Sequence, residues 1–215
     1  MNRQMPTHKS ELKKGIKHVS ATCSHLDKYI KISDECNLIA NELNVNSFYE
    51  SLVRSVIAQQ ISSTAALTIT NRVKKLTRGK ITPRIIANKK DKELKSVGLS
   101  ASKIKTIKGL AIAHLDKEID LSKLPDLSDD EVVKMLSSQW GIGRWTAEMF
   151  LMFSLGRLNV WPVGDLAVRK GWQISHNLKN TPNEKQLQPI GNPFEPYRSI
   201  AAWYCWRVLE PKEPW

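Results

Sequence analysis

The sequence lacks the features of a secreted or membrane-spanning protein. Its 215 residues contain no run of about 18 apolar residues, and the first 20 residues include no apolar signal-peptide segment. Cysteine is scarce, because only Cys23, Cys36 and Cys205 are present, an odd number at wide spacing. We therefore expect no disulfide framework and an intracellular location: the cytoplasm and nucleoid of a prokaryote or the nucleus of a eukaryote.

The cysteine pattern also argues against a metal centre. The sequence has no Cys-x-x-Cys pair and no evident histidine partner for a cysteine, and only Cys205 lies near the C-terminus. Zinc and iron–sulfur motifs need such grouped ligands. We therefore expect no metal-ligating side chains and no cofactor, and His114 and His176 are interpreted as ordinary helix residues.

Acidic residues are scarce in one part of the chain. The formal net charge is +12, and residues 71–110 carry thirteen basic side chains against Asp91 and Glu93, a net charge of +11. The basic residues are Arg72, Lys74, Lys75, Arg78, Lys80, Arg84, Lys89, Lys90, Lys92, Lys95, Lys103, Lys105 and Lys108. Such a segment is either a solvated face or a surface for a polyanion. Its density favours nucleic acid, because Lys and Arg bind by neutralising phosphates.

No convincing period-2 strand pattern occurs, whereas helix signals recur throughout, so we predict an all-α protein. Expected helix starts are a capping box at Ser47 and Glu50, Thr82 followed by a proline, Ser100, and a capping box at Ser128 and Glu131. Residues 180–196, rich in Pro, Asn and Gly, are expected to form a surface connection. The first 20 residues look disordered.

A tight turn, Gly141-Ile142-Gly143, lies between two helix-like segments. Both glycines could take a positive φ or admit another backbone closely. A glycine turn at a helix N-terminus presents backbone N–H groups that suit a phosphate oxygen without reading a base. The alternative is an ordinary corner between two helices, so other features must decide.

Asp165 follows this turn in the segment WPVGDLAVRKGW, where Pro162 and Gly164 shape a turn before a helix. It is a predicted N-cap, and a carboxylate at a helix N-terminus is stabilised in its ionised form. Such a group could stabilise a cationic sugar transition state or activate a water molecule.

Four segments together resemble a known family. They are FYESLVRSVIAQQISSTAA, VGLSASKIKTIKGLA, GIGRWTAEMFLMFSLGRLNVWPVGDLAVRKG and PYRSIAAWYCWR. They are similar to the DNA-3-methyladenine glycosylase II (alkylpurine) branch of the helix-hairpin-helix base-excision DNA glycosylases. The resemblance implies a bilobal all-α fold with a DNA-binding cleft between two helical lobes, one formed by residues 47–156 and the other by 1–46 and 157–215.

The resemblance also implies roles for individual residues. It makes Asp165 the catalytic aspartate and Gln60 or Ile61 the plug that fills the gap left by a flipped base. The base pocket would contain Trp145, Met149 and Tyr197. The hairpin that grips a DNA phosphate would consist of Gly141, Ile142, Gly143 and Arg144, and its main-chain carbonyls could also hold a metal ion.

The implied activity is hydrolysis of the N-glycosidic bond of alkylated purines in damaged double-stranded DNA, by a monomer. Trp145 occupies the position where strand-cutting relatives carry a Schiff-base lysine, so the product would be an abasic site. Two alternatives stay open. One is a related glycosylase for uracil, hypoxanthine or a mismatched base, and the other is a non-catalytic DNA-binding module with no need for Asp165.

Overall fold

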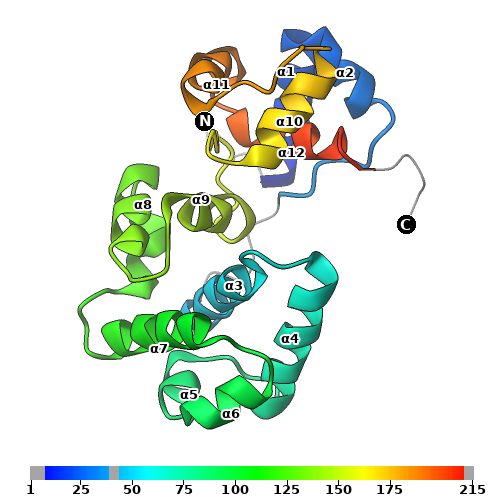
Figure 1. The fold of residues 1–215 in the computed structure, drawn as a ribbon. Helices are drawn as coiled ribbons and strands as arrows, with labels where there is room; N and C mark the ends of the chain where they lie inside the picture. The colour runs from blue at the N-terminus through cyan, green and yellow to red at the C-terminus, as the bar shows by residue number, and fades with distance from the viewer. Residues whose placement is uncertain (1–7, 39–43, 211–215) are drawn as a thin grey trace, which may run out of the picture. The chain divides into compact units, whose positions relative to one another are not determined.

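A computed structural model describes residues 8–38 and 44–210, and within these ranges the chain is helical and contains no strand (Figure 1). The all-α prediction is confirmed. The α-helices are α1 (His8–Thr22), α2 (Ser24–Ile30), α3 (Val45–Ala58), α4 (Ser63–Leu76), α5 (Pro83–Ala87), α6 (Asp91–Ser96), α7 (Ala101–Leu115), α8 (Asp129–Ser137), α9 (Arg144–Phe153), α10 (Leu166–Ser175), α11 (Glu184–Ile190) and α12 (Arg198–Arg207). Two 3₁₀ helices, η1 (Leu121–Asp126) and η2 (Asn192–Phe194), complete the set.

The chain divides into two compact units. The central unit is Ala40–Leu155, and the terminal unit combines Met1–Ile39 with Gly156–Trp215. The sequence predicted a central lobe of residues 47–156 flanked by the two chain ends. The first boundary of the central unit falls among residues 39–43, which lie outside the described ranges.

Helix α3 is the core of the central unit, where it packs against α4, α7 and α9. Its apolar stripe includes Phe48, Leu52 and Val56, all of them buried. Phe48 meets Phe150 of α9 edge to face, with ring centroids 5.7 Å apart. Buried aromatic pairs of this geometry stabilise a core beyond the area that they remove from water, so this contact fixes α9, the second helix of the predicted hairpin.

Most predicted helix starts in the central unit are confirmed. Thr82, Ser100 and Ser128 are N-caps whose side chains accept a backbone hydrogen bond. The predicted cap at Ser47 is wrong, because α3 begins one turn earlier, where Asn44 Oδ1 accepts from Ser47 N at 3.0 Å. Asn and Ser are equally good caps, so the local sequence alone did not separate the two positions.

Two α-helices of the terminal unit, α1 and α11, lie where the sequence predicted disorder and a loop. The prediction of a connecting loop over 180–196 is wrong, because Asn183 caps α11, which is followed by η2. Residues 8–20 of the disordered-looking N-terminus belong to α1, which packs against α2 and α12. Packing against α12 accounts for this helix. Gly15 of α1 lies so close to α12 that an added Cβ would be 2.2 Å from Ile200 Cδ1.

Within the described ranges, every helix is too short or too polar to span a lipid bilayer.

Candidate active site

The two hairpin glycines have different reasons to be glycine. Gly141 has φ +80°, and an added Cβ would lie 2.1 Å from Thr106 Oγ1, so both expected reasons hold there. Gly143 has φ −91°, and an added Cβ would meet no atom within 4 Å. The prediction of a positive φ or a close protein contact is therefore wrong for Gly143, which instead leaves open space at the start of α9.

The hairpin is tied to the end of α3 by Gln59. Gln59 Nε2 donates to Gly141 O and to Thr146 Oγ1, both at 3.2 Å. Nothing local in the sequence indicates this contact, because Gln59 and Gly141 are 82 residues apart. It joins the hairpin to the turn between α3 and α4, which holds the predicted plug.

Helix α7 supports this turn and the hairpin together. Lys103 Nζ donates to Ile57 O at 2.7 Å and to Gln59 O at 3.0 Å, where α3 ends. Burial lowers the pKa of Lys103. One turn further along α7, Thr106 packs against Gly141. Lys103 therefore acts within the protein as a cation at a helix C-terminus, although its sequence position suggested a phosphate-facing lysine.

The predicted plug lies at the tip of an exposed turn. Gln60 has φ +59°, an uncommon conformation for a residue with a side chain, and it is exposed. Ile61 beside it is 37% exposed. A left-handed non-glycine residue costs on the order of 1 kcal/mol, and such residues cluster at functional turns. Both plug candidates are thus accessible on a turn that Lys103 and Gln59 hold in place.

Helix α9 brings Trp145 and Met149 one turn apart. Trp145 is 38% exposed and Met149 is buried. The two apolar side chains therefore share one face of α9, with Trp145 at its exposed N-terminal end. Arg144 Nε donates to the buried Glu148 carboxylate at 2.8 Å while the Arg144 side chain stays largely exposed. A charged group is thereby fixed at the first position of α9, beside the open space at Gly143.

Asp165 is the N-cap of α10, as the sequence predicted. Its Oδ1 accepts from Val168 N at 2.8 Å and from Trp206 Nε1 at 3.2 Å, and the residue is only 7% exposed. Both donors contact the same carboxylate oxygen, one from the first turn of α10 and the other from α12. The result is a buried carboxylate held in one orientation by groups from the two helices.

A close helix crossing brings Trp206 to Asp165. At Gly171 of α10 an added Cβ would lie 1.9 Å from Cys205 O, so only glycine permits this approach of α10 to α12. Trp206, the next residue on α12, is half-buried and reaches Asp165. The sequence pointed to neither role, because Trp206 is 41 residues from Asp165 and Gly171 acts through its contact with Cys205 of α12.

Tyr197, the third predicted pocket residue, lies in the terminal unit. Its hydroxyl donates to Glu11 Oε2 at 3.0 Å, and its ring packs beside Gly15 of α1. Burial and the neighbouring Glu11 carboxylate raise the pKa of Tyr197. Half-buried, Tyr197 joins α1 to the start of α12; Trp145 and Met149 belong to the central unit.

The basic segment lies in the central unit and is largely exposed. Three of its lysines pair with carboxylates: Lys74 with Glu50, Lys89 with Glu93 and Lys108 with Asp91. Nine of its thirteen basic side chains are exposed: Arg72, Lys75, Arg78, Lys80, Arg84, Lys90, Lys92, Lys95 and Lys105. A surface of this charge suits a polyanion.

The resemblance allows a metal ion at main-chain carbonyls of the hairpin, two of which accept hydrogen bonds here. Gln139 O accepts from Ile142 N at 3.1 Å, and Gly141 O accepts from Gln59 Nε2. A carbonyl oxygen has two lone pairs, so each of these groups keeps an acceptor site for a cation.

Comparisons with known proteins agree with this geometry. Residues 53–196 match the family of HhH-GPD superfamily base excision DNA repair proteins. DNA-3-methyladenine glycosylase 1 of Schizosaccharomyces pombe is 37% identical over 163 residues, which cover 74% of this chain and 72% of that protein.

Solved structures extend the likeness to most of the chain. The Schizosaccharomyces pombe 3-methyladenine DNA glycosylase (Mag1) in complex with abasic DNA has a TM-score of 0.79 and 33% identity, covering 90% of this chain and 95% of that one. The DNA-3-methyladenine glycosidase of Bacillus halodurans has a TM-score of 0.76 and 34% identity, covering 89% and 87%. The chain therefore belongs to the HhH-GPD superfamily of base excision DNA repair proteins.

Proposed function

We propose that this protein is a DNA glycosylase that hydrolyses the N-glycosidic bond of alkylated purines in double-stranded DNA and leaves an abasic site. The observation that carries the proposal is the buried carboxylate of Asp165, which two donors hold at the N-terminus of α10 in a chain of this family. The similarity to proteins named DNA-3-methyladenine glycosylase supports the substrate class.

The chemistry needs only one carboxylate. Glycoside hydrolysis usually requires an acid to protonate the leaving group and a second carboxylate at the anomeric carbon. An N-alkylated purine already carries a positive charge, so it leaves as a neutral base without an acid. Asp165 then stabilises the oxocarbenium ion of the sugar and orients the attacking water. Its hydrogen bonds from Val168 and Trp206 keep its position fixed during the reaction.

Aromatic surface selects the base. The exposed part of the Trp145 ring can stack on a cationic, electron-poor purine, and Met149 supplies apolar surface one turn away. A neutral base such as uracil would instead need hydrogen-bond donors to its leaving group. Trp145 further makes the enzyme monofunctional, because it offers no amine to form a Schiff base with the sugar.

The central unit supplies the DNA contacts. The turn from Gly141 to Gly143, with Arg144 beside it, binds a backbone phosphate through main-chain N–H groups and one positive charge. Main-chain carbonyls of the same hairpin would hold a metal ion, which would add positive charge near that phosphate. Gln60, on its strained and exposed turn, enters the space left by the flipped nucleotide, with Ile61 as its neighbour.

The test is release of free bases from duplex DNA treated with a methylating agent, comparing the wild type with Asp165→Asn. We expect the wild type to release methylated purines and to give strand breaks only after alkali. The Asn variant should bind the same DNA without releasing bases.

Three other results would each contradict one part of the proposal. Strand breaks without alkali would contradict the monofunctional assignment. Release from a uracil or hypoxanthine duplex alone would replace the substrate class. Binding without any release from these duplexes would identify a DNA-binding module in which Asp165 is only a helix cap.

A further inference from the structure

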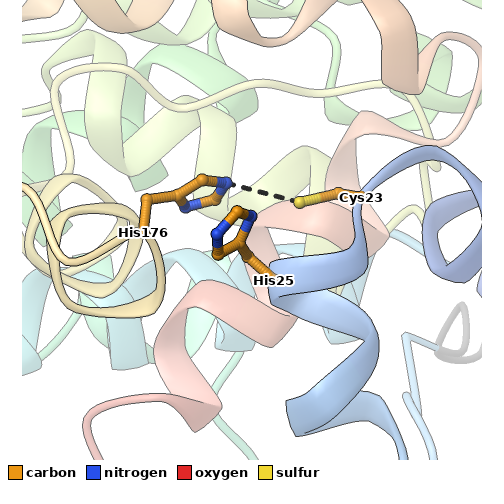
Figure 2. A group of neighbouring side chains, drawn as sticks. All are labelled: Cys23, His25 and His176. Carbon is orange, nitrogen blue, oxygen red and sulfur yellow. Dashed lines mark hydrogen bonds between the residues drawn. The ribbon is translucent and has the colours of Figure 1, made fainter.

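Three potential metal ligands gather within the terminal unit (Figure 2). Cys23 is the N-cap of α2, His25 lies in the first turn of that helix, and His176 is the C-cap of α10. The Cys23 Sγ and one ring nitrogen of each histidine all lie within 4.8 Å of one another. Cys23 is buried, His176 is half-buried and His25 is exposed, so the cluster runs from the interior to the surface.

The expectation that no cysteine has a histidine partner is therefore wrong. Cys23 and His176 are 153 residues apart, yet Cys23 Sγ lies 3.4 Å from His176 Nε2. His25, only two positions from Cys23, has its ring centroid 4.4 Å from that of His176. The spacing matches no common zinc motif, because the third ligand comes from the opposite end of the chain.

Hydrogen bonds fix the tautomer and orientation of His176. Its Nδ1 lies 3.1 Å from Trp172 O and 2.9 Å from Ser175 Oγ, whose own hydroxyl donates to Trp172 O. A carbonyl oxygen only accepts, so Nδ1 carries the hydrogen and Nε2 presents its lone pair to Cys23. The ring is also stacked on Trp172, with centroids 3.7 Å apart.

This is the arrangement of a metal-binding histidine, in which the nitrogen away from the ion donates to a backbone carbonyl. We propose that Cys23, His25 and His176 bind one late first-row transition-metal ion such as Zn²⁺, with water as the fourth ligand.

Distances and ligand types fit such an ion. Zn–S bonds of about 2.3 Å and Zn–N bonds of about 2.0–2.1 Å place S and N about 3.6 Å apart in a tetrahedron, close to the observed 3.4 Å. The His25 ring must turn to complete the set; its side chain is exposed, and its ring lies 4.4 Å from that of His176. One thiolate and two imidazoles suit Zn²⁺ and Co²⁺ and do not suit Mg²⁺ or Ca²⁺.

The ion would join two parts of the chain that the fold brings together. Cys23 and His25 precede residues 53–196, the range that matches the family. His176 ends α10, the helix that begins at Asp165. The ion would therefore fasten the N-terminal helices to the far end of the helix that carries the carboxylate, and its binding should stabilise the folded chain.

The experiment uses the full chain, reduced and stripped of metal with a chelator, and titrated with Co²⁺ and then with Zn²⁺. We expect one ion per chain, a thiolate-to-cobalt charge-transfer band with the visible absorption of tetrahedral Co²⁺, and displacement of Co²⁺ by Zn²⁺. The melting temperature should rise on addition of Zn²⁺.

Variants separate this site from adventitious binding. His25→Ala removes the exposed ligand of the three and should weaken Zn²⁺ binding by more than about tenfold. Cys23→Ser should remove the charge-transfer band. His114→Gln, which removes a histidine from the central unit, is the matched control and should bind as the wild type does.

The proposal fails if the wild type binds no stoichiometric metal, or if His25→Ala binds as tightly as the wild type. In either case the cluster is a hydrogen-bonded Cys–His pair with a ring contact. Circular dichroism of each variant checks that the helices are retained. None of these readouts uses base release, so the outcome is independent of the proposed glycosylase activity.

Discussion

Helices α9 and α10 begin in opposite ways. Gly143 starts α9 and has no side chain with which to cap it, and an added Cβ there would meet no atom within 4 Å. Asp165 starts α10, caps it at 2.8 Å through Val168 N, and is almost completely buried. One helix N-terminus is thus open, whereas the other is filled by a carboxylate of its own chain.

The same electrostatics explains both. A helix N-terminus favours an anion, because its first N–H groups and its dipole point toward that end. At α10 the anion is the Asp165 carboxylate of the protein itself, which is also the charged group of the proposed reaction. At α9 the anion would be a phosphate of DNA. A carboxylate can therefore be kept in an enzyme at little cost in stability when it also caps a helix.

The largest effect should come from removing the charge of Asp165. Asn is as good an N-cap as Asp, so Asp165→Asn should keep the melting temperature while slowing base release by about a thousandfold. Asp165→Ala should lose the activity and also about 1 kcal/mol of stability. Single-turnover base release and thermal unfolding measure the two quantities. Substantial activity in the Asn variant would show that the carboxylate is only a cap.

The next effect should separate the two hairpin glycines. Gly141→Ala adds a Cβ against Thr106 at a positive φ, so it should destabilise the central unit by about 2–5 kcal/mol. Gly143→Ala, the matched control, should change stability by less than about 1 kcal/mol but still weaken DNA binding, because its methyl group occupies the open space. Unfolding in denaturant and DNA titration would test this. Undiminished DNA binding by Gly143→Ala would contradict a phosphate site there.

A smaller effect is expected from the helix crossing that supports Asp165. Gly171→Ala places a Cβ 1.9 Å from Cys205 O, so α10 and α12 must shift. Overpacking should exceed the gain in helix propensity and cost about 2–3 kcal/mol. Base release should fall while binding through the hairpin of the central unit is retained. Unchanged stability and activity would show that the two helices can separate without consequence.

The smallest effect should come from the donor on α12. Trp206→Phe keeps an aromatic ring and removes the hydrogen bond to Asp165 Oδ1, leaving Val168 N as the cap donor. A hydrogen bond to a charged group contributes about 1.5–3 kcal/mol, and because Val168 N remains as a donor, we expect the lower end of this range. Base release should then slow by about tenfold with little change in DNA affinity. Rates equal to those of the wild type would show that Val168 alone positions the carboxylate.

Local patterns predicted what local contacts decide. Ser128 and Glu131 form the expected capping box, and Asp165 is the expected N-cap, because each depends on groups three residues apart. The predictions were wrong where two local signals competed or where a local signal was misleading. Asn44 replaced Ser47 as a cap, and the Pro-rich stretch from 180 contains α11, which supplies Leu187 O to Trp161 Nε1 at 3.0 Å.

The sequence by itself determined the helical class, the basic segment, the glycine hairpin and the place of Asp165 at a helix start. Only the tertiary structure decided that Trp206 donates to Asp165, that Gln59 holds Gly141, and that Cys23 meets His176. These partners are 41, 82 and 153 residues apart. Helix periodicity and capping act within a few residues, whereas such pairs depend on close crossings like that of Gly171 with Cys205, which arise only when whole helices pack.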